Sequence, residues 1–180
     1  MAKGTLHDCE RVFFRDPRSG LKITRLTHHP CISMNLYFEM CSFTEDDGHV
    51  VFLSQRYAGR EAPFDLFRVQ TNGMDLVQLT DCDDIGGIAV CPTTDSAYYL
   101  TRGELRRVHV KTLEEETIAR VPGERPTAPR SLATIDLKGK RYFGNVVNKE
   151  GRGSLFRVDT DTGKVTLIHE SDTQNHITVD

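Results

Sequence analysis

The sequence predicts an all-β fold, a β-propeller built from four-stranded antiparallel blades. The first observation is a hairpin phrase, two alternating apolar and polar runs around a turn, that occurs three times. The copies read DLFRVQTNGMDLVQLT (65–80), ELRRVHVKTLEEETIAR (104–120) and SLFRVDTDTGKVTLIHE (154–170). The second observation is that another pair of short strands precedes each copy. A unit of four strands therefore repeats every 40 to 50 residues or so, roughly the period of a propeller blade.

The strand before each hairpin is rich in β-branched and aromatic residues. These strands are HVVFLSQ (49–55), SAYYLTR (96–102) and KRYFGNV (140–146). A short apolar strand and a polar turn precede each of them, in CSFTEDDG (41–48), IAVCPTTD (88–95) and LATIDLKG (132–139). Because the first strand of a blade lines the propeller axis, we expect the axis to be lined by 39–44, 87–91 and 131–135.

The units divide the chain as parts of one propeller domain over 1–180. The full blades are expected at about 38–80, 86–122 and 130–170, with a partial blade at 11–27 and the start of another at 175–180. Three blades do not close a ring, which usually needs four to eight. We therefore expect the N-terminal half of a larger propeller, an incomplete ring whose open blade faces are covered by absent C-terminal blades or by another chain.

Two alternatives concern the fold. The segment KTLEEETIARV (111–121) has the composition of a short helix, but its place in the repeat favours a turn followed by the outer strand of a blade. A β-sandwich with chance similarity among its hairpins is the other possibility. The fixed order of strands and turns in the three units favours the propeller.

The composition is that of an ordinary globular domain. The chain has 180 residues, 38% of them hydrophobic, and a formal net charge of −3. Its 23 basic and 26 acidic residues are interspersed without a basic stripe, so no nucleic-acid partner is expected. We find no apolar run of signal-peptide or membrane-spanning length and expect a cytoplasmic protein without a membrane partner. The five cysteines lack C-x-x-C spacing, which is typical of reduced structural thiols.

Several phrases occur in an order that covers nearly the whole chain. They are FRDPRSGLKITRLT (14–27), YFEMCSFTEDDGHVVF (37–52), LVQLTD (76–81), VHVKTLEEETIARVP (108–122) and LFRVDTDTGKVTLIHE (155–170). In this order the chain resembles the oligogalacturonate lyases, cytoplasmic pectin-degrading enzymes with a seven-bladed propeller. The resemblance implies β-elimination cleavage of small oligogalacturonides such as digalacturonate, with this chain as the N-terminal half of the enzyme. The 180-residue chain alone is then expected to be inactive.

The same resemblance implies a catalytic apparatus. In the family a histidine acts as the base, arginines meet the substrate carboxylates, and histidines of later blades hold a manganese ion. His176 matches the position of the base, although Asn175 and Ile177 stand where the family pattern has Gly and Pro. The manganese ligands are expected beyond residue 180, so this chain is expected to supply no metal ligand.

Arginines in loops are the candidates for binding an acidic sugar. Arg56 and Arg152 occupy the loop after the second strand of their blades, and the guanidinium fork matches a carboxylate. An ordinary surface charge is the alternative for each. The pair in HHP (28–30) points in opposite directions on an extended segment, which disfavours joint chelation, although one of the two could face the central funnel.

A second function from a different class remains open. A TolB-like or WD-like propeller would use its loops to hold a protein partner and would carry out no chemistry. The sequence beyond residue 180 would distinguish the two functions, because a lyase should continue with blades that carry several histidines.

Overall fold

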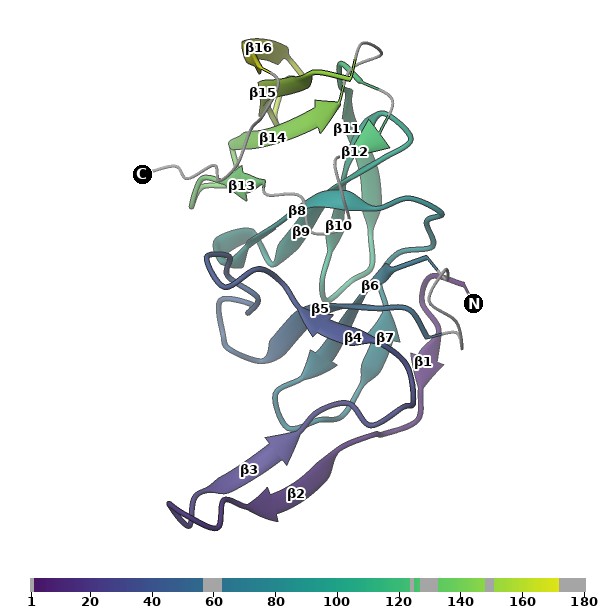
Figure 1. The fold of residues 1–180 in the computed structure, drawn as a ribbon, viewed down its shortest axis with the longest axis vertical. Helices are drawn as coiled ribbons and strands as arrows, with labels where there is room; N and C mark the ends of the chain where they lie inside the picture. The colour runs from purple at the N-terminus through teal and green to yellow at the C-terminus, as the bar shows by residue number, and fades with distance from the viewer. Residues whose placement is uncertain (1, 57–62, 124, 127–132, 148–150, 172–180) are drawn as a thin grey trace.

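The computed structural model describes residues 2–56, 63–123, 125–126, 133–147 and 151–171. Apart from one short turn of 3₁₀ helix, η1 (Pro92–Thr94), every regular element of this part is a strand. The strands form three sheets and a separate hairpin, which follow one another in an open arc (Figure 1). The prediction of an all-β, propeller-like fold with an open ring is confirmed. No helix in the described ranges is long and apolar enough to cross a membrane.

The first sheet has the strand order β1-β7-β6-β5-β4. Its strands are β1 (Leu6–His7), β4 (Ser33–Asn35), β5 (His49–Ser54), β6 (Asp65–Gln70) and β7 (Leu76–Gln78). The strand β1 had no counterpart in the predicted unit. It pairs antiparallel with β7 and ties the N-terminal segment to the outer edge of the sheet.

The inner strand of this sheet begins earlier than predicted. The prediction placed it at 39–44, ahead of the turn in 41–48, but there only one bridge, Phe43 to Val50, forms. The inner strand is β4, whose first residue Ser33 lies opposite Ser54 with the two hydroxyls 3.0 Å apart. The predicted polar turn does form, because the Asp46 carboxylate accepts hydrogen bonds from Thr44 and Gly48 and closes the chain too tightly for a longer ladder.

The second sheet matches the predicted unit of four strands. Its order is β11-β10-β9-β8, with β8 (Gly86–Cys91), β9 (Ser96–Thr101), β10 (Glu104–His109) and β11 (Glu115–Arg120). The segment 111–121 is therefore a turn and a strand, as the repeat indicated. Tertiary pairing overrides the helix propensity of its three consecutive glutamates.

The third sheet repeats the arrangement with a divided inner strand. The strands β12 (Arg125–Pro126) and β13 (Thr134–Ile135) both pair with β14 (Arg141–Val147), followed by β15 (Gly153–Asp159) and β16 (Val165–Ser171). The next strand predicted, at 175–180, lies outside the described residues.

Apolar cores lie between neighbouring sheets, because alternate residues of a strand point to opposite faces. Tyr99 belongs to the core shared with the first sheet, and its neighbour Tyr98 to the core shared with the third. Both are completely buried. Tyr98 lies 6.5 Å from Tyr142 between ring centroids, and Tyr142 lies 6.2 Å from Phe156. Aromatic packing therefore fixes the second and third sheets face to face.

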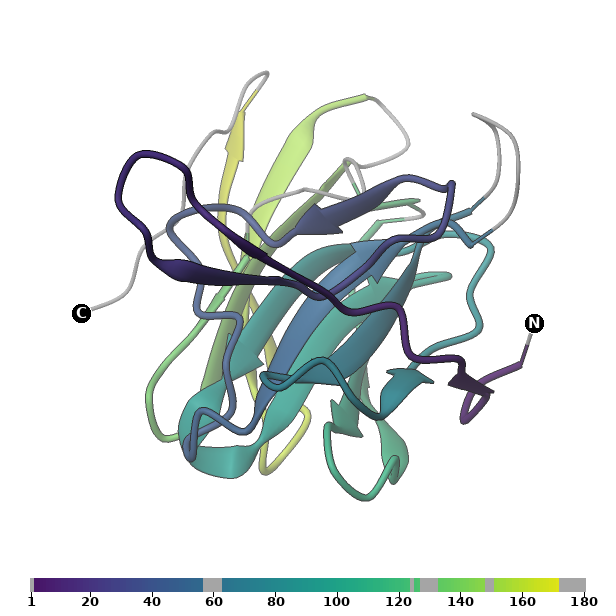
Figure 2. The same cartoon turned by 90° about the horizontal axis from the view of Figure 1, so that it is seen from below.

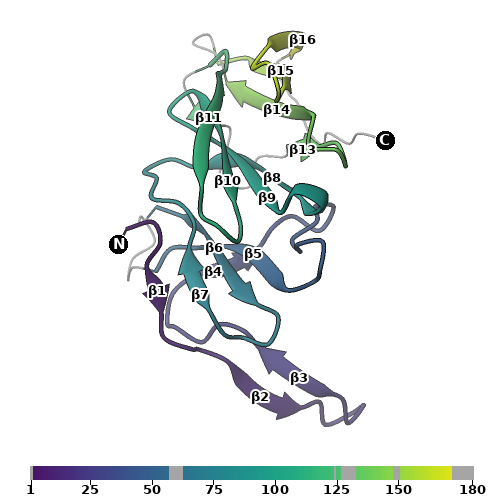
Figure 3. The same cartoon turned by 180° about the vertical axis from the view of Figure 1, so that it is seen from behind.

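A two-stranded hairpin stands at one end of the arc (Figure 3). It consists of β2 (Val12–Arg15) and β3 (Lys22–Arg25), within the predicted partial blade at 11–27. Viewed from below, the hairpin lies over the first sheet (Figure 2), where Leu26 packs on the cluster that contains Phe52. Its Phe13 and Phe14 are about half exposed.

The strand register defines one end of the sheets that matters for function. Ser33, Ser54 and Asp65 lie side by side in the first sheet, so the connection before β4 and the turn after β5 share one end. Thr101 pairs with Glu104 at the matching turn of the second sheet, and Val147 with Gly153 in the third. We call this the loop end and the opposite one the turn end.

Candidate functional site

Arg56, a predicted substrate-binding residue, lies two residues after the end of β5 at the loop end. It has a left-handed backbone conformation, with φ of 50°, and is 5% exposed. Its Nη2 lies 2.6 Å from Oε1 of Glu10, and its guanidinium lies 5.4 Å from the centroid of the Phe67 ring. The charge of Arg56 is therefore balanced by a carboxylate of the N-terminal segment.

Glu10 connects Arg56 to the segment that enters the first sheet. Its Oε2 accepts the backbone N–H groups of His28, at 2.8 Å, and His29, at 3.0 Å. Burial alone would raise the pKa of the Glu10 carboxyl, but the Arg56 and backbone hydrogen bonds lower it below the ordinary value. The side chains of HHP (28–30) are exposed while their backbone is held by Glu10. A substrate carboxylate that used Arg56 would compete with Glu10.

The second sheet carries an arginine at the same turn, which the sequence interpretation missed. Arg102 follows β9, has φ of 48° and pairs with Asp83 on the surface. Asp84 accepts the Thr101 hydroxyl at 2.8 Å and the backbone N–H of Arg102 at 3.1 Å, and so fixes the turn. The repeat itself was the signal, since TRG (101–103) stands where QR (55–56) stands one unit earlier.

The remaining predicted residues lie in the third unit and after it. Arg152 is exposed and directly precedes β15 at the loop end, on a different sheet from Arg56. His176 lies outside the described residues, as do its neighbours Asn175 and Ile177. The substrate-binding role of the two arginines and the catalytic role of His176 stay predictions.

The inner segments of the three units converge on one small cavity. It has a volume of about 180 Å³ and is lined by 39–41, 89–92 and 133–137. These residues overlap the ranges expected at the axis, 39–44, 87–91 and 131–135, although the inner strand of the first sheet is β4 and not 39–44. Asp136 on its wall accepts hydrogen bonds from the backbone of Lys140, at 2.7 Å, and from Nε of Arg141, at 2.9 Å. The cavity reaches the turn end and is separate from the three arginines.

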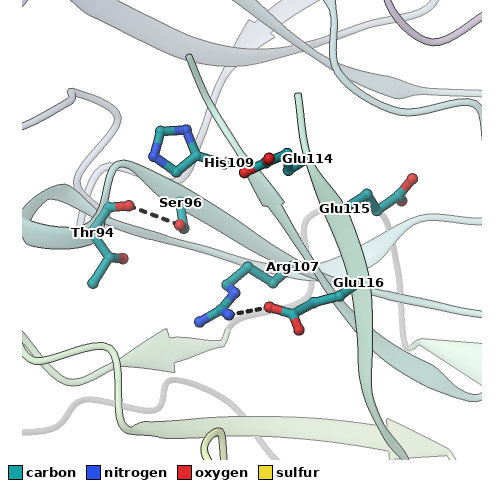
Figure 4. Close-up of a pocket in the computed structure, with 7 residues that line it drawn as sticks. All are labelled: Thr94, Ser96, Arg107, His109, Glu114, Glu115 and Glu116. Carbon is teal, nitrogen blue, oxygen red and sulfur yellow. Dashed lines mark hydrogen bonds and ion pairs between the residues drawn. The ribbon is translucent and has the colours of Figure 1, made fainter. Parts of the chain in front are cut away.

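A larger hollow of about 480 Å³ lies on the flank of the second sheet (Figure 4). Its charged side chains already have partners within the protein, Glu115 among them through Lys3 and Tyr99. Arg107 pairs with Glu116, and Nδ1 of His109 accepts the backbone N–H groups of Lys111 and Thr112. His109 therefore stabilises the turn between β10 and β11.

A metal centre does not form in the described part of the chain. Within these ranges no group of three or more His, Cys, Asp or Glu side chains is placed to hold a metal ion. The residues in these ranges therefore do not fit a manganese site.

These features define a propeller-type protein with arginines at one end of its sheets. The family described as oligogalacturonate lyase matches residues 1–150, well over half of the chain. An oligogalacturonide lyase of Pectobacterium atrosepticum is 30% identical over 128 residues, which cover 69% of this chain and 32% of that protein. The chain belongs to the oligogalacturonate lyase family.

Solved structures agree with the fold. An oligogalacturonate lyase in complex with manganese superposes with a TM-score of 0.75 at 23% identity, over 97% of this chain and 50% of that one. The oligogalacturonate lyase of Vibrio parahaemolyticus gives a TM-score of 0.72 at 20% identity, over 95% and 49%. TolB from Acinetobacter baumannii gives 0.57 at 13% identity, over 87% and 37%. The chain spans about half the length of these lyase structures.

Proposed function

We propose that this chain is part of an oligogalacturonate lyase, which cleaves small oligogalacturonides by β-elimination. The observation that carries the proposal is the family match over residues 1–150. The Pectobacterium relative, named an oligogalacturonide lyase, supports it. Because the chain spans 50% of one lyase structure, we assign the activity to a protein that contains this half together with further blades.

The reaction sets requirements that the predicted residues could meet. Elimination removes the proton at C5 of a galacturonide, next to its carboxylate, and expels the oxygen at C4. The carbon becomes acidic enough only when the carboxylate charge is balanced, which suits a guanidinium such as that of Arg152 or Arg56. A neutral imidazole, which we assign to His176, then accepts the proton near neutral pH.

Manganese belongs to the proposal through a relative only. One lyase structure holds the ion, and we propose that this chain's complete protein uses it as well. When bound, such an ion supplies positive charge opposite a substrate carboxylate. Its ligands are expected outside the described residues, as is the acidic oligosaccharide's full binding site.

The test monitors the ultraviolet absorbance of the unsaturated product from digalacturonate. We expect the protein that carries the complete propeller to form product, and His176→Ala to lower the rate by roughly 10²- to 10⁴-fold. His109→Asn is the matched control, because the asparagine oxygen can accept the turn N–H groups that Nδ1 of His109 accepts. The 180-residue chain alone should show no turnover with added manganese.

Two outcomes would change the proposal. Normal activity of His176→Ala would remove this residue from the mechanism. Lack of activity of the complete protein on every oligogalacturonide would favour a propeller that binds a protein partner without chemistry.

A further inference from the structure

Cys31 lies at the loop end of the first sheet among hydrogen-bond donors. Its Sγ is 3.5 Å from the Ser54 hydroxyl, 3.8 Å from the Ser33 hydroxyl and 3.8 Å from Nη1 of Arg56. The residue is half-buried, so it is partly shielded from solvent but still accessible to small reagents. We call Cys31, Ser33, Ser54, Arg56 and Glu10 the Cys31 cluster.

The cation of the cluster is fixed in place. The Arg56 side chain is 3% exposed, and its Nη2 is held by Glu10 while Nη1 points at the sulfur. Its Nε is buried without a hydrogen-bond partner among the described residues. The guanidinium therefore keeps one N–H group without an acceptor within that part of the chain. A negative charge on the Cys31 sulfur would lie beside this cation.

These contacts favour the thiolate over the thiol. Burial alone would raise the pKa of Cys31, but hydrogen bonds from Ser54, His29, Arg56 and Ser33 lower it from 9.0 to about 7. Glu10 is the opposing negative charge, and its ion pair with Arg56 limits its effect on the sulfur.

The other four cysteines lack this environment. Cys9 and Cys41 are exposed, and their sulfurs face backbone carbonyls, of Gly73 at 3.4 Å and of Phe43 at 3.6 Å, instead of a cation. Cys82 and Cys91 are buried, and burial raises the pKa of Cys82 to about 11. Cys31 therefore differs from the other cysteines in the hydrogen-bond donors around its sulfur, and not only in its exposure.

We propose that Cys31 is a nucleophilic thiol and that its cluster is a covalent modification site for small soft electrophiles, peroxides among them. With hydrogen peroxide, the thiolate sulfur attacks one oxygen, the O–O bond breaks and hydroxide leaves. The sulfur is oxidised to a sulfenic acid while the peroxide is reduced. The cluster shares Arg56 with the residues proposed to meet a substrate carboxylate, but the test of the thiol does not depend on lyase activity.

The first experiment measures alkylation by iodoacetamide from pH 5 to 10, with mass spectrometry resolving each cysteine. The thiolate carbon–sulfur bond forms as iodide leaves, so the rate follows the thiolate fraction. We expect a midpoint near pH 7 for Cys31, below the pKa of about 8.5 that is typical of a free cysteine. The midpoint is read instead of the absolute rate, because a lower pKa also lowers intrinsic nucleophilicity.

Two variants test whether the cluster sets the pH midpoint of Cys31 alkylation. Arg56→Met removes the cation and Ser54→Ala removes one donor, and each should move the Cys31 midpoint upward. Ser54→Ala exchanges similar volumes, so it keeps the test valid if Arg56→Met does not fold. A Cys31 midpoint at or above about 8.5, the pKa of a free cysteine, or one unchanged in Ser54→Ala, would overturn the proposal.

The second experiment exposes the protein to hydrogen peroxide with dimedone, which traps sulfenic acids. We expect the adduct on Cys31 in preference to the more exposed Cys9 and Cys41. The Cys31→Ser variant serves as the control that should lose this adduct. Equal labelling of the exposed cysteines would contradict a site built by the cluster.

Discussion

The ion pair between Glu10 and Arg56 gives the sharpest test of how this end of the first sheet is held together. Glu10→Ala removes the carboxylate that lies 2.6 Å from Nη2 of Arg56. The guanidinium stays behind with 3% of its side chain exposed, so water cannot replace the lost partner. We expect a large loss of stability because an unpaired charge then remains buried.

The size of the loss follows from this burial. Removing one partner of a buried ion pair typically costs about 3–5 kcal/mol. The backbone N–H groups of His28 and His29 also lose their acceptor, but those residues are exposed and water can replace it. For a chain of this length, each kcal/mol lowers Tm by about 2–4 °C, which gives a decrease of roughly 6–20 °C.

The pH dependence of stability supplies an independent reading. The pKa of Glu10 is lower in the folded protein than in the unfolded chain, where it lies near 4.3. Its contribution is therefore present above about pH 4.3 and is lost as the pH falls through the lower, folded value. Glu10→Ala should remove this part of the acid sensitivity.

Urea unfolding followed by far-ultraviolet circular dichroism measures both effects, since the chain has no tryptophan. The control is Asp161→Ala, which breaks the exposed pair of Asp161 with Lys140 and should cost at most about 1 kcal/mol. The double variant Glu10→Ala with Arg56→Met should recover part of the loss, because no charge is left buried. A Glu10→Ala protein as stable as Asp161→Ala would refute the reasoning.

Three further predictions concern the sheets. Burial raises the pKa of Asp65 to about 6, above its value in the unfolded chain, so the free energy of unfolding should fall as the pH rises from about 4 to 6. Urea unfolding of Asp65→Asn should show that this pH dependence is lost. Tyr142→Phe deletes a buried hydroxyl that donates to the Gly87 carbonyl at 2.5 Å and should cost about 1–2 kcal/mol by the same measurement. Gly163→Ala should lower Tm more than Gly20→Ala: both have positive φ, but only the Gly163 Cβ would lie 2.7 Å from a backbone oxygen. Equal Tm losses would contradict a steric role for that oxygen.

Much of the fold was predictable because strand alternation is a local signal. Tyr98 and Tyr99 are adjacent in sequence and belong to the cores on opposite faces of the second sheet, as period-two alternation requires. The repeat also decided the state of 111–121, where local propensity alone favoured a helix. A pattern that recurs three times carries tertiary information that no single segment has.

The parts that the sequence missed depend on contacts between distant residues. The strand β1 has only two residues and exists through pairing with β7, about 70 positions later in the chain. The inner strand β4 was misplaced because its register is set by Ser33 and Ser54, which are 21 positions apart. The Cys31 cluster likewise combines three segments, and its sequence offers no motif.

The three arginines at the loop end show why a repeat position does not fix a role. Arg56, Arg102 and Arg152 occupy equivalent turns, yet the first is buried and the other two are exposed. The acids that pair with Arg56 and Arg102, Glu10 and Asp83, both come from outside the paired strands of their blades. Each blade thus carries an arginine at this turn, while the connecting segments supply the carboxylate that pairs with it in the first two sheets. Because Glu10 holds Arg56 in the first sheet, any carboxylate that bound Arg56 would have to displace that buried ion pair, whereas Arg152 lies exposed on a different sheet.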